Sequence, residues 1–210
     1  VGNTTLYPLT YIPDSIRYYT NGTLVAAPAV GAAAPLTLTG ISVPAGGNAT
    51  IIYETTTNEF TPRGNEDSVT NTVTVTGAGL ANAVTATESV SPVAAPDLAI
   101  TKSVSPSIVA ENGQITYTFL IENYGNTEAS ASDNVIITDT FNPILTGITV
   151  TYNGKAWTAP ASYTYNEATG EFATVAGQIT VPAATFTQNT ATGVITTTPG
   201  TATMTVTGTI

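Results

Sequence analysis

The sequence predicts an all-β protein, and three observations support that fold class. Apolar and polar residues alternate with a period of two along much of the chain, as in residues 69–75 and 115–123. Pairs such as Asn21-Gly22 and Asn153-Gly154, which are typical of tight turns, separate the alternating runs. No segment shows the apolar spacing of a helix, and β-branched Thr and Val are abundant. We therefore expect β-sandwich architecture without helices.

The expected strands follow the alternating runs in order. In residues 69–75 the side chains of Val69, Asn71, Val73 and Val75 share one face, and the intervening Thr residues share the other. The full set of expected strands is residues 16–20, 36–43, 49–56, 69–75, 83–90, 98–104, 115–123, 135–141, 146–152, 162–165, 171–175, 178–182, 194–198 and 202–209.

Composition excludes several function classes. Only 9% of the 210 residues are charged and the net charge is −10, which argues against nucleic-acid binding and against anionic membranes. The chain has no Cys and no His, so it lacks thiol chemistry, disulfides and the usual catalytic triads. No run reaches the roughly 18 apolar residues of a membrane span. We expect an extracellular binding or structural protein, not an enzyme, with no cofactor and no metal.

Two domains are expected, residues 1–95 and 96–210, joined by the Pro-containing connector 91–97. Segments on the two sides resemble each other in the same order, which indicates an internal repeat. Residues 9–22 resemble 145–154, and residues 44–54 resemble 199–208.

The repeat is staggered between the two copies. The second copy has three strands before its matching segment, within residues 98–141, whereas only eight residues precede that segment in the first copy. The first copy continues into two strands, 68–77 and 83–90, that the second does not contain. Each domain is therefore expected to lack strands, opening ones in the first and closing ones in the second, which leaves open sheet edges.

Two segments of the chain resemble a known family. The run DLAITKSVSP, NGQITYTFLIENYGNTEAS and NVIITDTF, within residues 97–141, resembles the conserved repeat domain of bacterial surface proteins called domain of unknown function eleven. The run SVPAGGNATIIYE followed by VTNTVTVTG resembles the back half of the same repeat. The chain looks closest to short two-repeat clostridial proteins, some of which resemble subunits of spore-surface appendages. The resemblance implies immunoglobulin-like sandwiches and an extracellular structural role.

Lys102 is the first candidate for site chemistry. It is one of four basic residues, and its parity places it on the apolar face with Leu98, Ile100 and Val104. Asp139 and Asn123 have the same inward phase on neighbouring strands. One hypothesis is an isopeptide bond, in which a neutral Lys102 amine attacks a side-chain amide while Asp139 carries the protons. The alternatives are a plain Lys102–Asp139 ion pair or a lysine that reaches out to water.

There are two alternative acceptors for such an isopeptide bond. One is Asn123 within the same domain. The other is an Asn equivalent to Asn71, carried by a closing strand from another chain. Glu88, which shares a face with Val84, Ala86 and Val90, is a candidate partner for a Lys in the strands missing from the first copy.

The leading functional expectation is a filament subunit. A strand from one subunit would complete the sheet of the next, giving a head-to-tail homopolymer on a cell or spore surface. The donor is expected to resemble 68–77 and to lie upstream of Val1. The alternative is a stalk or adhesin repeat of a larger surface protein with a ligand site in its loops. The expected wall of the acceptor groove consists of Ile115, Tyr117, Phe119, Val135, Ile137, Met204 and Val206.

Other candidate sites are weaker. Trp157, Tyr163 and Tyr165 are a possible stacking platform for a glycan, although ordinary core packing is the more common role of such residues. Glu66, Asp67 and Glu111 show no calcium-loop pattern, so acidic solvated loops are expected there.

Overall fold

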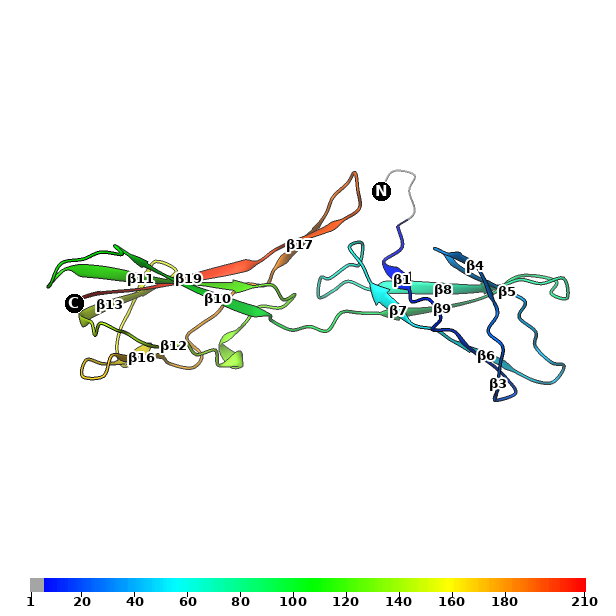
Figure 1. Cartoon of the computed structure of the whole chain (residues 1–210), viewed down its shortest axis with the longest axis horizontal. Coiled ribbons are helices and arrows are strands. Elements are labelled where there is room, and N and C mark those ends of the chain that lie inside the picture. Colours follow the sequence, from blue (N-terminus) through cyan, green and yellow to red (C-terminus); the bar gives the residue numbers. More distant parts are fainter. Residues whose placement is uncertain (1–5) are drawn as a thin grey trace. The chain divides into compact units, whose positions relative to one another are not determined.

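The computed structural model describes residues 6–210, and its fold is all-β: 48% of the chain is strand and 1% is helix. The one described helical turn is η1 (Ala131–Asp133). The predicted fold class is thus confirmed. The chain divides into two compact units (Figure 1). Unit 1 comprises residues 1–91 with 187–196, and unit 2 comprises residues 92–186 with 197–210.

Unit 1 is built from small sheets. A three-stranded sheet has the order β3-β2-β6, and three further pairs are β1-β7, β4-β5 and β8-β9. The strands are β1 (Leu9–Tyr11), β2 (Arg17–Thr20), β3 (Thr23–Val25), β4 (Ala29–Ala33), β5 (Leu36–Thr39), β6 (Ala49–Ile52), β7 (Thr55–Thr57), β8 (Val69–Val75) and β9 (Val84–Val90). Residues 187–196, at the tip of the hairpin formed by β17 (Thr185–Gln188) and β18 (Ile195–Thr198), also belong here. The Ile195 N–H donates to the Glu59 carbonyl oxygen at 2.8 Å.

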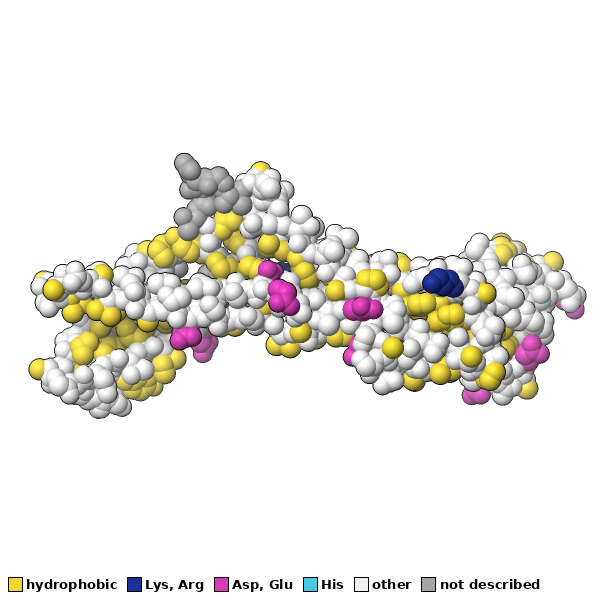
Figure 2. Space-filling view, turned by 180° about the vertical axis from the view of Figure 1, so that it is seen from behind, with side chains coloured by type: hydrophobic (Ala, Val, Ile, Leu, Met, Phe, Trp, Pro, Cys, Tyr) yellow, Lys and Arg dark blue, Asp and Glu magenta, His cyan; other side chains and the backbone are white. Residues whose placement is uncertain are grey.

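Few apolar side chains of unit 1 are shielded from water. Among its described hydrophobic residues only Ile16 and Tyr18 are buried. Many others on its strands and loops are exposed by more than two fifths, and hydrophobic side chains are visible on the surface in Figure 2. They include Leu24, Val30, Val43, Ile52, Val73, Val75, Val84 and Val90. The small sheets of unit 1 thus do not enclose a sizeable core by themselves.

Unit 2 consists of two sheets packed face to face. The larger has the order β10-β11-β19-β13-β14 and the smaller the order β12-β16-β15. The strands are β10 (Leu98–Ser105), β11 (Gln114–Asn123), β12 (Thr138–Thr140), β13 (Thr146–Tyr152), β14 (Lys155–Trp157), β15 (Tyr163–Asn166), β16 (Glu171–Thr174) and β19 (Gly200–Thr209). β10 and β12 are edge strands of their sheets.

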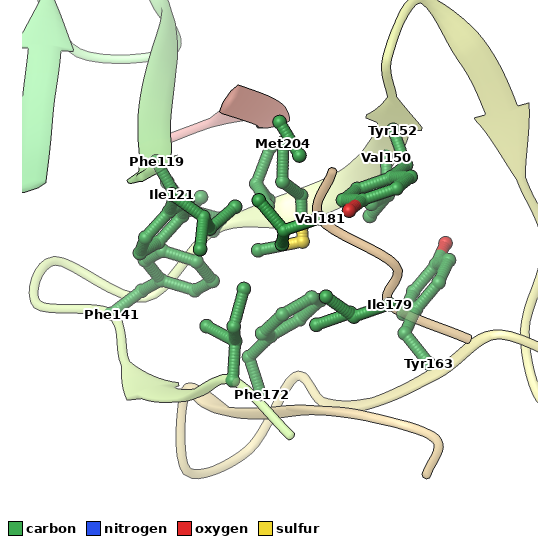
Figure 3. Packing of buried hydrophobic residues seen from close by; sticks show 14 of the residues in the cluster. Phe119, Ile121, Phe141, Val150, Tyr152, Tyr163, Phe172, Ile179, Val181 and Met204 are labelled. Carbon is green, nitrogen blue, oxygen red and sulfur yellow. The ribbon is translucent and has the colours of Figure 1, made fainter. Parts of the chain in front are cut away.

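The core of unit 2 lies between these sheets, as Figure 3 shows. Phe119 and Ile121 of β11, Met204 of β19 and Phe172 of β16 meet there and are 0–3% exposed. Alternate side chains of β11 and β19 enter this core because successive residues of a strand point to opposite faces. The outward Thr residues pair across strands, as in the 2.8 Å hydrogen bond between the hydroxyls of Thr116 and Thr207.

The two units share a hairpin of the same geometry. β2 and β3 are joined by Asn21-Gly22, and β13 and β14 are joined by Asn153-Gly154. The φ angles are 49° and 78° in the first turn and 48° and 75° in the second. Positive φ at both central residues is the conformation that suits Asn-Gly in a two-residue hairpin. In each unit the first strand of the hairpin also pairs with the strand of the second matching segment, β6 or β19.

The units differ at the next strand position. In unit 2, β19 pairs with β11 from Gly200 to Thr209 and so lies inside its sheet. In unit 1, the corresponding strand β6 pairs only with β2 and is an edge of its sheet. Conversely, the described part of unit 2 contains no counterpart of the β8-β9 pair, which follows β6 in unit 1.

Several strand positions differ from the predicted ones. Residues 178–182 do not form a strand: Val181 makes only an isolated bridge with Ala129. Of the expected strand 135–141, only Thr138–Thr140 pairs, with β16. The strand β17 lies outside every alternating run that the sequence shows.

Candidate functional site

Lys102 and Asp139 lie together where the two sheets of unit 2 have their open edges. Lys102 belongs to the edge strand β10 and Asp139 to the edge strand β12. Lys102 Nζ forms an ion pair with Asp139 Oδ2. The pair therefore joins the two sheets on the side where neither has a further strand.

Aromatic rings surround the Lys102 ammonium. Its Nζ lies 4.4 Å from the centroid of Tyr117, 5.2 Å from that of Phe141 and 5.6 Å from that of Phe119. These distances fit cation–π contacts, and the rings of Tyr117 and Phe141 also stack on each other at 5.0 Å. Three aromatic rings thus pack against the amine, while the Lys102 side chain stays partly exposed to water.

Both oxygens of the Asp139 carboxylate are contacted. Its Oδ1 accepts a hydrogen bond from the Thr140 N–H at 2.9 Å. Its Oδ2 is buried and contacts the Lys102 ammonium, and it has no other hydrogen-bond partner among the residues described. The Asp139 side chain is 17% exposed and that of Lys102 is 38% exposed. The lysine therefore lies exposed at an edge and is not enclosed in the core.

The face of β10 that carries Lys102 is apolar but uncovered. Leu98, Ile100 and Val104 share this face, and their side chains are 37%, 52% and 42% exposed. β10 pairs with β11 on one side, and no strand among the described residues pairs with its other edge. The backbone groups of that edge are available to a further strand.

The residues expected to line an open groove mostly lie inside the closed core instead. Ile115, Phe119, Ile137, Met204 and Val206 are at most 8% exposed, and only Tyr117 and Val135 are partly buried. The groove prediction is corrected for this reason: the smaller sheet, together with Ile179 and Val181, already covers that face. The uncovered surface is the edge formed by β10 and β12.

Asn123 is not close to Lys102. In the register of β10 and β11, Lys102 faces Phe119 and Asn123 faces Leu98, four residues farther along and thus about 13 Å away. The amide of Asn123 is fully buried and fully bonded. Its Oδ1 accepts from the N–H groups of Asp97 and Gly125, and its Nδ2 donates to the carbonyls of Thr127 and Val181. The Asn123 side chain thus connects the backbone before β10 to the loop after β11, and it does not serve as an acceptor for Lys102.

Asn71 and Glu88 face each other across the β8-β9 pair, called the ribbon below. The register places Asn71 opposite Glu88, Val73 opposite Ala86 and Val75 opposite Val84. The opposite face carries hydroxyls, with hydrogen bonds of 2.8 Å between Thr70 and Ser89 and 3.0 Å between Thr72 and Thr87. The predicted faces of both strands are confirmed by this register. One face of the ribbon is apolar with a polar pair within it, and that face is exposed.

The remaining candidates have structural roles. Tyr163 is buried against Phe172, and the Tyr165 hydroxyl donates to the Leu145 carbonyl at 2.8 Å. The Trp157 ring stacks on Tyr152 with centroids 4.8 Å apart. These three aromatics therefore pack into unit 2 and do not form an exposed platform for a glycan.

The acidic candidates also have local roles or none that the structure describes. Asp67 accepts a hydrogen bond from the Gly64 N–H at 2.6 Å, within its own loop. No group of three or more acidic side chains suited to a metal ion occurs within residues 6–210.

Comparison with family models, curated proteins and solved structures found no match to this chain. No helix within the described part of the chain has the length and apolar character of a membrane span.

Proposed function

We propose that the chain is a structural subunit of an extracellular bacterial filament, and that subunits join head-to-tail by strand complementation. The observation that carries the proposal is the ribbon. A two-stranded pair is marginally stable in water when it has no sheet or helix to pack against. Yet the ribbon pairs with no other described strand, and Val73, Val75, Val84 and Val90 are each more than half exposed.

Covering this face yields substantial stabilisation. Complete burial of one valine side chain contributes about 1.5–3 kcal/mol, so covering the exposed half of each adds roughly 1 kcal/mol. Four such valines contribute about 4 kcal/mol in total, and the backbone hydrogen bonds of an added strand contribute further to the contact.

The open edge of unit 2 offers the complementary surface. The edges of β10 and β12 are unpaired, and the apolar face of β10 is uncovered. Because donor and acceptor are different surfaces of one chain, each added subunit presents a new acceptor. Such a heterologous contact extends into a fibre instead of closing into a dimer.

The same proposal includes the family and the fold type. The two units are staggered copies of an immunoglobulin-like repeat of bacterial surface proteins, displayed on a cell or spore surface. The shared Asn-Gly hairpin and the equivalent pairing of β6 and β19 support two copies of one repeat.

The test compares two neighbouring positions on opposite faces of the ribbon. Val73→Lys places a charge on the apolar face, whereas Thr72→Lys places it on the hydroxyl face. We expect the native chain and Thr72→Lys to form regular fibres in electron micrographs and large species in light scattering. Val73→Lys should remain monomeric with unchanged β-sheet circular dichroism. Dispersed monomers of the native chain at millimolar concentration would overturn the proposal.

A further inference from the structure

We propose that a covalent bond joins neighbouring subunits of the filament. Lys102 Nζ of one subunit forms an amide with the side chain of Asn71 in the ribbon of the next subunit. This inference rests on the proposed function, because the ribbon reaches Lys102 only when it covers the β10–β12 edge. The occupant of that edge is therefore a second copy of this chain.

The two faces match in their order of residues. On β10, Lys102 stands between Ile100 and Val104 at spacings of two; on β8, Asn71 stands between Val69 and Val73 at the same spacings. When Asn71 lies opposite Lys102, each apolar neighbour meets an apolar neighbour. The match is preserved whether the strands run parallel or antiparallel, since both patterns are symmetric about the polar residue.

The polar groups of the two faces also complement each other. Unit 2 contributes an ammonium and a carboxylate in contact, Lys102 and Asp139. The ribbon contributes an amide, Asn71, with the Glu88 carboxyl directly opposite, at the roughly 5 Å that separates cross-strand neighbours. Burying Lys102 and Asn71 together therefore does not leave either without a polar partner.

Docking of the ribbon also prepares the amine. Tyr117, Phe119 and Phe141 already enclose Lys102 Nζ on its inner side, so the ribbon excludes water from the remaining side. In a site without water, two opposite charges in contact are converted to two neutral groups when the proton of the ammonium moves to Asp139. The product is a neutral amine beside a protonated acid.

The step balances without any other reactant. The neutral Nζ attacks Cγ of Asn71 and forms a tetrahedral intermediate, and the protonated Asp139 donates a hydrogen bond to its oxyanion. Asp139 first passes its proton to the departing nitrogen and then, as a carboxylate, takes the extra proton from Nζ, which the released ammonia finally carries away. One carbon–nitrogen bond forms, one breaks, ammonia leaves as ammonium, and Asp139 returns to its carboxylate form. Each bond lowers the mass by that of one ammonia, about 17 Da.

The experiment uses fibres of the full chain, boiled in detergent and separated by size. We expect a ladder of multimers, each link lowering the mass by about 17 Da, and a cross-linked peptide joining Lys102 to Asn71 after chymotrypsin digestion. Lys102→Met, Asn71→Ala and Asp139→Ala should each abolish the ladder while fibres still appear in micrographs. Lys155→Met, which alters the other lysine of unit 2, should keep it.

The conservative variant Asn71→Asp should change the mass lost per link, which a folding defect would not do. Asn71→Asp retains an acceptor carbon but releases water, so its links should lower the mass by about 18 Da. Fibres that dissolve to monomers of unchanged mass would overturn the covalent bond and leave the proposed function standing. Monomers that lose ammonia without a ladder would place the bond within one chain and overturn the intersubunit lock. The absence of fibres altogether would instead overturn the proposed function.

Discussion

Asn21 of unit 1 and Asn153 of unit 2 make the same two hydrogen bonds. The Asn21 N–H donates to the Asn48 carbonyl at 3.1 Å, and the Asn21 Oδ1 accepts from the Asn48 N–H at 2.9 Å. The Asn153 N–H donates to the Thr203 carbonyl at 2.8 Å, and its Oδ1 accepts from the Thr203 N–H at 2.9 Å. Each side chain thus extends a strand pairing by one step, beyond the point where the chain turns.

Asn153→Ala should destabilise unit 2 by about 2 kcal/mol. The alanine must adopt a left-handed conformation, which costs roughly 1 kcal/mol, and the hydrogen bond to the Thr203 N–H is lost, which costs about as much again. Trp157, the single tryptophan, stacks on Tyr152 beside this turn, so its fluorescence reports the unfolding of unit 2 in denaturant. The matched control is Asn21→Ala, which makes the same change in unit 1. An equal shift of the Trp157 transition in both variants would contradict the prediction.

Asn123→Ala should be far more costly than substitution of an exposed Asn. It removes four hydrogen bonds from a fully buried side chain and leaves the N–H groups of Asp97 and Gly125, both part-buried, without their acceptor. Unsatisfied buried groups cost about 1–3 kcal/mol each, so we expect a loss of roughly 3–5 kcal/mol. Asn166→Ala is the control, since this exposed Asn accepts one bond, from the Ala168 N–H. Denaturant titration followed by Trp157 fluorescence measures the free energy of unfolding of both variants. Similar losses of stability in the two would show that the buried hydrogen bonds of Asn123 contribute no more than the exposed one of Asn166.

The faces of single strands could be predicted from the sequence because they depend only on the period of two. Val69, Asn71, Val73 and Val75 share a face of β8, as the alternation indicates. The same argument put Lys102 and Asp139 in one inward phase, and the structure places them in contact. Asn-Gly pairs were equally informative, since few other pairs suit positive φ at both central positions.

Relations across strands could not be predicted in this way. The parity of Asn123 matches that of Lys102, but the register of β10 and β11 separates them by four residues. The residues expected to line a groove do have the inward parity, but they are buried. Ile179 and Val181 help to cover them, and these two residues lie in a segment whose only strand pairing is one isolated bridge. Alternation along single strands gives no sign of this cover. Inter-strand register and coverage depend on the packing of distant segments, which no local pattern encodes.

Gly125→Ala should destabilise unit 2 by about 2 kcal/mol or more through a steric clash. A Cβ at this position would meet the Ala95 carbonyl oxygen and would lie 2.5 Å from the Asp97 nitrogen and 2.7 Å from the Pro96 carbonyl carbon. These are backbone atoms, so relief requires a shift of the main chain, and overpacking of this kind costs typically 1–3 kcal/mol. Thermal melts followed by circular dichroism measure the loss. Gly79→Ala serves as control, because a Cβ there has nothing within 4 Å; equal melting temperatures for the two variants would refute the clash.

The stability of unit 2 should fall as the pH rises above about 10, and Tyr152 should contribute to that fall. Burial raises the pKa of Tyr152 above its usual 10.0, and the neutral hydroxyl donates a hydrogen bond to the Thr180 carbonyl at 2.7 Å. The unfolded chain therefore loses this proton at a lower pH than the folded chain. The contribution is complete below the unfolded pKa and is lost as the pH approaches the folded one.

Tyr152→Phe separates this titration from the packing of the ring. At about pH 8 the variant should be less stable by roughly 1 kcal/mol, because the Thr180 carbonyl loses its donor. Above pH 10.0 the wild-type protein loses stability through Tyr152 and the variant does not, so the gap between their free energies of unfolding should narrow. Denaturant titrations of Trp157 fluorescence at several pH values up to about 11 test this. Parallel curves across that range would mean that the phenol loses its proton equally in both states, and burial would then have no net effect on its ionisation.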